Sequence, residues 1–279
     1  MSSSPPKQLF TLPIAAQGTQ HPGGTITCTE PRERLYVLTW TSPADNRLTT
    51  PFLQTLLTAL DLLEFGYPSG AVLTTSGIPK FYSNGLDLAH ARETEGFWAL
   101  LYSVWRRFLT YPMPTVSYMN GHSFAGGLML AMAHDYRLAP SPKGYLCANE
   151  LNFGAPLLPA MSAIFRHKLP ASTYRSIVLE AHMFPGAEAV SAGIADATAT
   201  SLDEALAFAE KKALKDKNAK GVYGVLKAEM YKDLLAFMQA PTMQAEEARF
   251  AAEEERERER REFGKVWFEQ WQGEQKAKL

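Results

Sequence analysis

The chain has 279 residues, of which 46% are apolar, and a formal net charge of −1. This length and composition can bury a full-sized core, and the balanced charge does not indicate binding to nucleic acid or an anionic membrane. Two cysteines, Cys28 and Cys147, are too few for a disulfide framework and fit a reducing compartment. The sequence has no apolar run of about 18 residues and no secretory pattern at its start, so we expect neither a membrane span nor secretion.

Short strands alternate with helices in the first part of the chain. In chain order we predict strands at 25–30 and 34–40, a helix at 51–63, a strand at 71–75, a helix at 97–109, a strand at 115–119 followed at once by a helix to about 133, and strands at 136–139 and 145–148. Such alternation is typical of an α/β domain. We assign residues 1–24 to an N-terminal extension and residues 25–200 to the core that carries the functional site.

The chain after Ser201 is predicted to be helical, with helices at 202–216, 222–238 and 245–271. The last helix contains the run EEERERERRE at 253–262. Its opposite charges three and four residues apart predict a solvated, salt-bridged helix rather than a nucleic-acid site. We assign residues 201–271 to a helical region used for oligomerisation and residues 272–279 to a polar tail.

An aromatic stripe follows the charged run. Phe263, Trp267 and Trp271 recur every four residues and therefore lie along one side of the predicted helix. Such a stripe is more often a packing surface than a cofactor site. We expect it to pack on the chain's own core or on a neighbouring subunit.

Two glycine-bearing turns stand out in the core. Residues 80–88, KFYSNGLDL, follow the strand at 71–75, and residues 119–130, MNGHSFAGGLML, lie between a strand and a helix. Each contains Asn-Gly, which is foremost a turn dipeptide. Taken singly, each turn is therefore an ordinary loop.

The second turn also resembles a nucleophile elbow. Gly121-His-Ser-Phe-Ala125 nearly matches Gly-x-Ser-x-Gly between a strand and a helix, which would make Ser123 the nucleophile of a hydrolase. Ala125 replaces the final glycine, however. The last histidine of the chain is His182, so nothing beyond it can supply the late histidine of that fold. Both features argue against a hydrolase.

The two turns taken together, with three further segments, carry a more specific signal. The order and spacing of five segments resemble the crotonase (enoyl-CoA hydratase/isomerase) superfamily, and within it the plant and fungal Δ3,Δ2-enoyl-CoA isomerases. The resemblance covers roughly residues 25–240. The matching segments are FYSNGLDL at 81–88, YPMPTV at 111–116 with NGH at 120–122, GLMLAMAHDY at 127–136, NELNFG at 149–154 and AVSAGIAD at 189–196.

The resemblance implies a fold and a binding site for a thioester carbonyl. The fold is a spiral of β-β-α units followed by helices that make trimer contacts. The oxyanion hole is formed by the backbone N–H groups of Leu86 and Gly126, of which the second begins a helix, where N–H groups are left unpaired. Ala125 stands where many relatives carry glycine. The substrate-contacting residues implied are Ser83, Asn84, Gly85, Leu86, Asp87 and Gly126.

The number of carboxylates distinguishes between reactions. Hydratases of the superfamily carry two glutamates, and by the resemblance the first falls on Met129 and the second on Glu150. Methionine cannot move protons, whereas one carboxylate suffices for a 1,3-proton shift. The sequence therefore predicts an isomerase with Glu150 as its base. We expect apolar neighbours to raise its pKa, namely Leu151, Phe153, Ala155, Leu157 and Leu158.

Other polar residues near these motifs are less specific. Asp87 is expected to cap the helix that follows it, because aspartate is a preferred N-cap. Asn84 is expected to shape the turn. His122 and His134 have no metal-ligand spacing and are interpreted as structural. Candidates for contact with the phosphates of CoA are Lys80, Arg92, Arg106 and Arg107, among which the sequence does not choose.

The last three residues resemble a targeting signal. Ala277-Lys278-Leu279 is a conservative variant of the Ser-Lys-Leu peroxisomal address, which predicts a peroxisomal location and binding to the import receptor. The resemblance implies an acyl-CoA substrate, a homotrimer or hexamer, a role in β-oxidation of unsaturated fatty acids, and no metal or other cofactor. Three alternatives stay open: a hydratase or other crotonase reaction, the hydrolase with Ser123, and a non-catalytic interaction protein.

Overall fold

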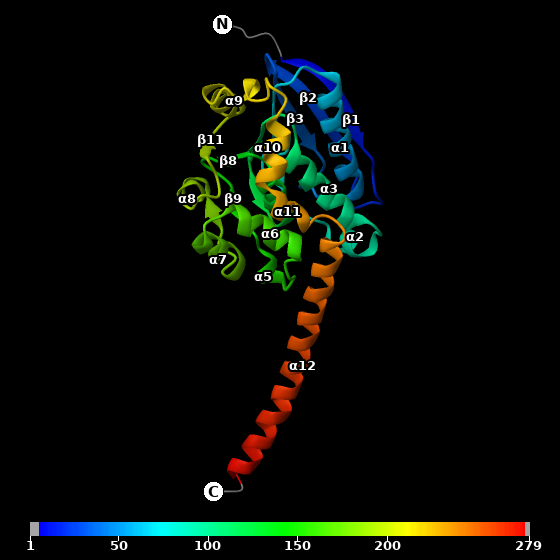
Figure 1. Cartoon of the computed structure of the whole chain (residues 1–279), viewed down its shortest axis with the longest axis vertical. Coiled ribbons are helices and arrows are strands. Elements are labelled where there is room, and N and C mark those ends of the chain that lie inside the picture. Colours follow the sequence, from blue (N-terminus) through cyan, green and yellow to red (C-terminus); the bar gives the residue numbers. More distant parts are fainter. Residues whose placement is uncertain (1–5, 277–279) are drawn as a thin grey trace.

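A seven-stranded sheet forms the centre of the molecule. The computed structural model describes residues 6–276 (Figure 1). The strand order is β1-β2-β3-β4-β6-β8-β11; β1 to β3 pair antiparallel, and every later pairing is parallel. The strands are β1 (Lys7–Ile14), β2 (Gly24–Arg32), β3 (Leu35–Thr41), β4 (Ala71–Ser76), β6 (Thr115–Tyr118), β8 (Tyr136–Pro140) and β11 (Ala197–Ala199).

A small second sheet lies beside the first and determines where the site forms. Its order is β10-β9-β7-β5, from β5 (Phe81–Ser83), β7 (His122–Phe124), β9 (Tyr145–Cys147) and β10 (Phe184–Pro185). A long strand, a short strand and helices follow one another three times: β4-β5 before α2 and α3, β6-β7 before α4, and β8-β9 before α5 and α6. The predicted spiral of β-β-α units is thus present.

Helices cover the sheets and continue to the end of the chain. The first eight are α1 (Thr50–Gly66), α2 (Leu88–Glu93), α3 (Phe97–Thr110), α4 (Gly126–Met132), α5 (Glu150–Phe153), α6 (Pro159–Lys168), α7 (Ala171–Leu179) and α8 (Gly186–Ser191). The remainder are α9 (Leu202–Lys211), the 3-10 turn η1 (Leu214–Asp216), α10 (Tyr223–Met230), α11 (Lys232–Ala236) and α12 (Thr242–Lys276). No helix within residues 6–276 is long and apolar enough to cross a membrane.

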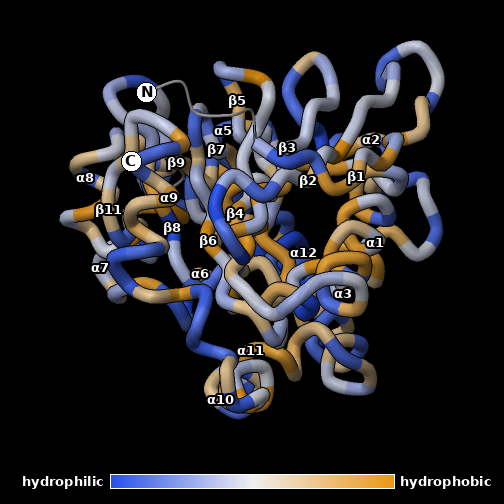
Figure 2. Tube along the Cα trace, turned by 90° about the horizontal axis from the view of Figure 1, so that it is seen from above, coloured by the Kyte–Doolittle hydropathy of each residue, from blue (hydrophilic) through white to orange (hydrophobic). Residues whose placement is uncertain are grey.

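Both faces of the large sheet are buried, as its sequence pattern requires. In β3 alternate side chains point to opposite faces: Tyr36, Leu38 and Trp40 join the main core with α1 and α3, whereas Leu35 and Val37 pack toward α9. A strand covered on both sides needs apolar residues at nearly every position. Figure 2 shows the apolar segments concentrated between the strands and helices α1 and α3.

Two predictions about the elements were wrong. Residues 1–24 were assigned to an extension, but β1 pairs with β2 and belongs to the sheet. Alternation in β1 is weak because most of its side chains are at least partly exposed. A helix was also predicted directly after β6, but β7 intervenes. At three residues, β7 is too short to show a periodicity in the sequence.

The C-terminal helices do not behave as one unit. Lys227 of α10 is buried and donates to Phe108 O (2.7 Å) and Asp135 Oδ1 (2.7 Å), which fixes α10 to the core. Leu234 and Leu235 of α11 join the main core. In contrast, α12 leaves the body and extends away from it (Figure 1). The assignment of residues 201–271 to a single region therefore needs correction: only α12 stands apart.

Candidate active site

Three turns converge at one edge of the small sheet. β5, β7 and β9 are parallel neighbours, so their carboxyl ends lie at the same edge. Leu86 follows β5, Gly126 follows β7 and Glu150 follows β9. The topology thus brings together three residues that are far apart in the sequence, as predicted.

Contacts with the segment before α1 hold the first turn. Asn84 N donates to Asp45 O (3.0 Å), and Leu48 N donates to Gly85 O (2.9 Å). Gly85 has φ 81°, in the left-handed region that favours glycine. A β-carbon there would stand 2.9 Å from Phe124 O, so the close approach of the second turn also requires glycine.

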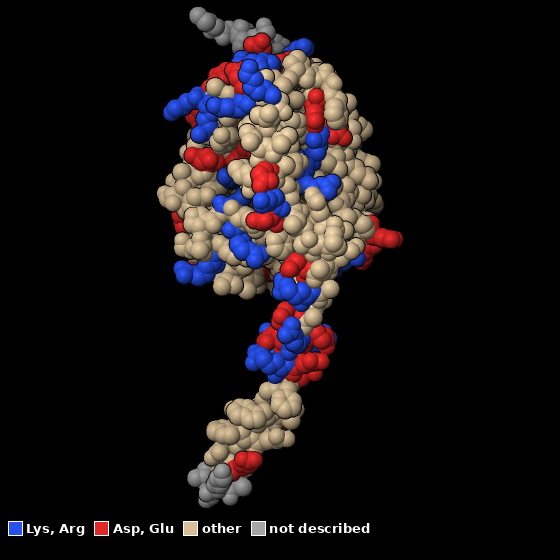
Figure 3. Space-filling view, in the orientation of Figure 1, with Lys and Arg blue, Asp and Glu red and all other residues tan. Residues whose placement is uncertain are grey.

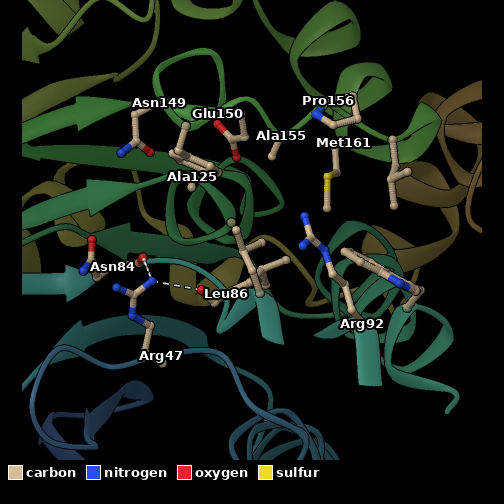
Figure 4. A pocket seen from close by; sticks show the side chains of 15 residues that line it. Arg47, Asn84, Leu86, Arg92, Ala125, Asn149, Glu150, Ala155, Pro156 and Met161 are labelled. Carbon is tan, nitrogen blue, oxygen red and sulfur yellow. Dashed lines mark hydrogen bonds between the residues drawn. The ribbon is translucent and has the colours of Figure 1, made fainter. Parts of the chain in front are cut away.

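Arg47 bridges the two ends of this turn. Its Nη1 donates to the carbonyl oxygens of Asn84 and Leu86, both at 2.9 Å (Figure 4). Its Nε donates to Asp45 Oδ2 (3.1 Å), which also accepts from Asn84 Nδ2 (2.6 Å). With both flanking carbonyls held by one guanidinium, the peptide between them has a fixed orientation. The N–H of Leu86 donates to no residue of the described chain.

The second turn places a helix N-terminus against the first. Ala125 has φ 49°, a conformation unusual for a residue with a side chain, and its N–H donates to Cys147 O (2.8 Å). Gly126 then begins α4, and its N–H has no acceptor within residues 6–276. A β-carbon at Gly126 would stand 3.5 Å from Leu86 N. The two amides therefore lie close to each other.

Glu150 supplies the carboxylate of the site. It is the first residue of α5 and is half-buried; its Oε2 is buried and accepts no hydrogen bond from the described residues. Burial raises the pKa of Glu150 from 4.5 to about 7, and a hydrogen bond with its own backbone opposes this only in part. The expected rise in pKa is thus present. Such a carboxyl group can both take and return a proton near neutral pH.

These groups line a cavity of about 680 Å³ (Figure 4). Glu150 is its only acidic residue within the described chain. The lining residues are Arg47, Asn84, Leu86, Leu88, Arg92, Trp98, Ala125, Gly126, Asn149, Glu150, Phe153, Ala155, Pro156, Leu158 and Met161. Of the five predicted apolar neighbours, Phe153, Ala155 and Leu158 line it. Leu151 is largely exposed and Leu157 lies outside the lining.

A second hollow of about 450 Å³ adjoins the first. The two share Arg47, Leu86 and Leu88, so together they could hold one elongated ligand. The remaining lining residues are Gln20, His21, Ala44, Asp45 and Asp87. No three His, Cys, Asp or Glu side chains within residues 6–276 are grouped so as to hold a metal ion.

Two residues predicted to contact substrate, Ser83 and Asp87, make structural contacts within the fold. Ser83 is fully buried; its hydroxyl donates to Asn46 O (2.8 Å) and accepts from Gly85 N (3.2 Å), so it supports the turn from behind. Asp87 caps α2, as predicted, by accepting from His90 N (3.0 Å), and it also contacts His21 Nε2 (2.6 Å). Burial raises the pKa of Asp87, but these two contacts outweigh it and lower the pKa overall.

The basic residues predicted as candidates for contact with the CoA phosphates differ in their position relative to the cavity. Arg92 lines the cavity. Arg107, however, is engaged by Asp61 and Glu64 of α1, lies over the ring of Tyr111 and does not line the cavity. Lys80 lies over the ring of Phe81 and does not line the cavity.

The two histidines in the motifs are structural in this fold. His134 is fully buried, contacts Thr74 Oγ1 (2.9 Å) and Leu130 O (3.0 Å), and has its pKa lowered to about 3 by burial. His122 stacks on Tyr145 and accepts from Tyr145 N through Nδ1 (3.2 Å). Neither lines the cavity that contains Glu150.

Sequence reasoning missed several lining residues. Arg47, Trp98 and Met161 belong to no motif singled out in the sequence, and Asn149 was not predicted to line the site. A signal was available for Asn149 alone, since it adjoins Glu150 in the matched NELNFG segment. Met129, at the position of the first hydratase glutamate, is fully buried among apolar residues.

Comparison with known proteins identifies the family. The family model described as enoyl-CoA hydratase/isomerase matches residues 30–274. The chain belongs to this family. Its relatives include the peroxisomal enoyl-CoA delta isomerase 2 of Arabidopsis thaliana, 32% identical over 76% of this chain and 95% of that protein. The mitochondrial enoyl-CoA delta isomerase 1 of Homo sapiens is also 32% identical, over 57% of this chain and 55% of that protein.

Solved structures of the enoyl-CoA hydratase/isomerase family share the fold. The human mitochondrial Δ3-Δ2-enoyl-CoA isomerase aligns with a TM-score of 0.64 at 23% identity, covering 80% of this chain and 95% of that one. A probable enoyl-CoA hydratase from Mycobacterium tuberculosis aligns with a TM-score of 0.67 at 24% identity, covering 82% and 95%. Proteins named for two different reactions thus have this architecture, so the reaction must be argued from the site.

Proposed function

We propose that the protein converts 3-enoyl-CoA into trans-2-enoyl-CoA by a 1,3-proton shift, with Glu150 as the only proton carrier. The observation that carries this proposal is that the cavity contains one carboxylate among the described residues. Addition of water would require a second group to activate the water. The position where hydratases carry that glutamate is Met129, which is buried and cannot titrate.

The chemistry needs no other reactant. Glu150 removes a proton from C2 of the 3-enoyl thioester, and the electron pair moves onto the thioester oxygen as an enolate. The same carboxylic acid then delivers the proton to C4. The double bond moves from C3–C4 to C2–C3 as the thioester carbonyl forms again. A pKa near 7 suits both steps, because the raised pKa makes the carboxylate a stronger base and a substantial fraction of it is still ionised near neutral pH.

The amides of Leu86 and Gly126 are proposed to hold the enolate oxygen. Both N–H groups lack acceptors in the described chain, they lie close together, and Gly126 begins a helix. Donors aimed at a developing negative charge contribute more in the transition state than in the ground state. Fixing them in the backbone means that no reorganisation is needed during the reaction.

The cavity shape suggests how the substrate lies. Leu88, Trp98, Phe153, Leu158 and Met161 offer apolar surface for the acyl chain. The adjoining hollow, with Arg47 at the boundary, is proposed to receive part of the CoA moiety. Among the candidate basic residues, Arg92 is the one that lines the cavity.

A peroxisomal location and an oligomeric assembly complete the proposal. Enoyl-CoA delta isomerases 1 and 2 of Arabidopsis thaliana are named peroxisomal, although the mammalian relatives are named mitochondrial. The tail Ala277-Lys278-Leu279, which lies outside the described residues, fits recognition by the import receptor. We propose a role in β-oxidation of unsaturated fatty acids, and assembly of the body as a homotrimer or hexamer.

The competing reactions have weaker support. A hydratase is represented among the relatives by a putative enoyl-CoA hydratase of Thermus thermophilus, 31% identical over 60% of this chain, but Met129 opposes it. Ser123 is fully buried, and its hydroxyl makes no hydrogen bond to any described residue, so no base activates it. A hydrolase is therefore disfavoured by geometry.

The decisive experiment uses purified protein with 3-hexenoyl-CoA and follows the conjugated 2-enoyl thioester by absorbance. We expect turnover, and a loss of about 1000-fold in Glu150→Gln, whose amide keeps the shape but cannot move a proton. Glu188→Gln, at an exposed carboxylate, serves as the control. Formation of 3-hydroxyacyl-CoA from a 2-enoyl-CoA, or release of free CoA thiol, would instead establish the hydratase or the hydrolase.

A further inference from the structure

An aromatic patch lies on the far part of α12, remote from the body. From Ala251 to Lys276 every residue except Glu257 is exposed, and Figure 3 shows the patch as an uncharged surface beyond the mixed charges of the arm. Phe268 and Trp271 stack with ring centroids 5.9 Å apart. The exposed fractions are 76% for Phe263, 53% for Val266, 57% for Trp267, 48% for Phe268 and 45% for Trp271. The expected packing on the chain's own core is therefore absent.

The charged part of the arm needs no partner of its own. Its ion pairs link residues three or four apart: Arg256 with Glu253, Arg258 with Glu255, and Arg260 and Arg261 with Glu257. Such pairs stabilise an isolated helix. The charged segment thus acts as a stiff spacer, and the apolar surface that calls for a partner is confined to the patch.

The patch and the charges that flank it form one stripe. Arg260, Phe263, Trp267, Trp271 and Glu274 follow at intervals of three, four, four and three residues, which places them within about 80° of the helix circumference. Lys265, Glu269 and Gln272 lie on the opposite side. The stripe therefore has a basic end, an aromatic centre and an acidic end.

We propose that this stripe binds the same stripe of a second copy of the chain, with the two helices antiparallel and related by a two-fold axis at Trp267. The axis places Trp267 against Trp267 of the partner subunit, Phe263 opposite the partner subunit's Trp271, and Arg260 opposite the partner subunit's Glu274. The contact between the two Trp267 side chains lies on the axis and occurs once, whereas each of the other two contacts occurs twice. Opposite charges thus meet at both ends of a buried aromatic centre.

The arrangement is sterically open. Lys276 of one copy would lie level with residue 258 of the other, which is still about 24 Å along the helix from Thr242, where α12 joins the body. Neither end of the paired helices reaches the partner's body. Arg260 can turn toward the partner's carboxylate because Glu257 also accepts from Arg261 (3.0 Å).

A membrane is a poorer occupant of the patch. Residues 259–276 carry four acidic and four basic side chains, so no net charge attracts the helix to anionic lipids. Insertion of the stripe would also bring Arg260 and Glu274 into the lipid interface. A parallel pairing of two copies would place Arg260 beside Arg260 and Glu274 beside Glu274. Only the antiparallel pairing brings opposite charges together.

Charge exchange in the full-length chain tests the pairing by light scattering or sedimentation. Arg260→Glu alone and Glu274→Arg alone should each lower the mass of the assembly in solution at least twofold. In either variant, positions 260 and 274 of the two copies carry like charges. Mixing the two variants, or combining both changes in one chain, should restore the mass. Lys265→Glu on the opposite side of the helix is the matched control and should change nothing. Equal masses for all variants would overturn the proposal.

Engineered cysteines test the register, since Cys28 and Cys147 are buried. Under oxidation Trp267→Cys should form linked dimers by itself, whereas Phe263→Cys should link to Trp271→Cys in a mixture but not to itself. Glu269→Cys, on the opposite side of the helix, is the control and gives the amount of linked dimer formed by random collisions. Self-linking of Phe263→Cys would indicate parallel helices and overturn the pairing. Neither result depends on the proposed isomerase activity.

Two further outcomes would also overturn the proposal. The stripe would be a lipid-binding surface if two results came together. The wild type, but not Trp267→Glu, would sediment with neutral or anionic vesicles, and the charge-exchange variants would have the same mass in solution as the wild type. It would dock on a partner's body if Val225→Glu, in the exposed apolar face of α10, abolished association instead. In all variants of α12 we expect unchanged turnover of 3-hexenoyl-CoA.

Discussion

The turns around the cavity and the arm formed by α12 are stabilised in opposite ways. Asn84 and Gly85 are held by Asp45, Arg47 and Leu48, nearly forty residues earlier in the chain. In α12 the ion pairs join residues three or four positions apart, and no residue is buried. The turns around the cavity can form only in the complete fold, whereas the helical conformation of α12 depends on residues close together in the sequence.

This difference predicts how each region responds to change. A substitution in the turns alters several long-range contacts at once and moves groups that line the cavity. A substitution in the arm alters one solvated ion pair, which contributes little to the stability of the fold.

The pH dependence of Glu150 should give the largest effect. Because the base must be ionised, kcat/KM should fall about tenfold per pH unit below about 7. The pKa of Glu150 is raised on folding, so this group stabilises the fold below its ordinary pKa and that contribution is lost as the pH rises through 7. At pH 8 Glu150→Gln should therefore be more stable to urea than the wild type, by on the order of 2–3 kcal/mol. At pH 4.5 the variant and the wild type should unfold at nearly the same urea concentration. A difference that does not vary with pH would contradict the burial of this carboxyl group.

Breaking the buried pair between Lys227 and Asp135 should cost the most stability. Lys227→Met leaves the Asp135 carboxylate buried with only Thr115 and Tyr223 as partners, which should destabilise the body by about 3 kcal/mol in urea unfolding. Glu257→Gln in α12 is the matched control and should leave the unfolding midpoint unchanged. Equal effects of Lys227→Met and Glu257→Gln on the unfolding midpoint would contradict the difference in stabilisation between the body and the arm.

Gly126→Ala should damage catalysis more than folding. The added methyl group would stand 2.9 Å from Leu86 Cδ2 and 3.0 Å from Cγ, a side chain that can move, and would fill the space beside the two amides. We expect kcat to fall about 100-fold with little change in Tm. Gly66→Ala meets nothing within 4 Å and serves as the control. Normal turnover in Gly126→Ala would remove these amides from the mechanism.

Arg47→Gln should have the smallest catalytic effect of the series. Loss of the contacts with Asn84 O and Leu86 O frees the peptide that carries the Leu86 N–H, so kcat should fall about tenfold with KM little changed. Arg92→Gln is the comparison, because Arg92 lines the cavity without contacting the turn. A rise in KM alone for Arg47→Gln would show that this side chain binds substrate rather than positioning the turn.

The site was only partly predictable because sequence motifs record spacing but not contacts. Leu86, Gly126 and Glu150 belong to segments whose order along the chain is specific, and all three line the cavity. Ser83 lies in the same motif yet does not line the cavity, because its hydroxyl is fully buried in contacts with Asn46 O and Gly85 N. Arg47 lacks any signal: the groups of the turn that it contacts are backbone carbonyls, which every residue provides.

Elements whose stability is local can be predicted from their own residues. The charge spacing of 253–262 and the stripe at Phe263, Trp267 and Trp271 predict α12 without reference to the rest of the chain. Only the tertiary structure decided that β5, β7 and β9 run parallel with their ends together, that Glu150 is buried enough to raise its pKa, and that α12 leaves the body. The reason is physical: intrahelical contacts join near neighbours, whereas strand pairing and burial depend on residues brought together from distant parts of the chain.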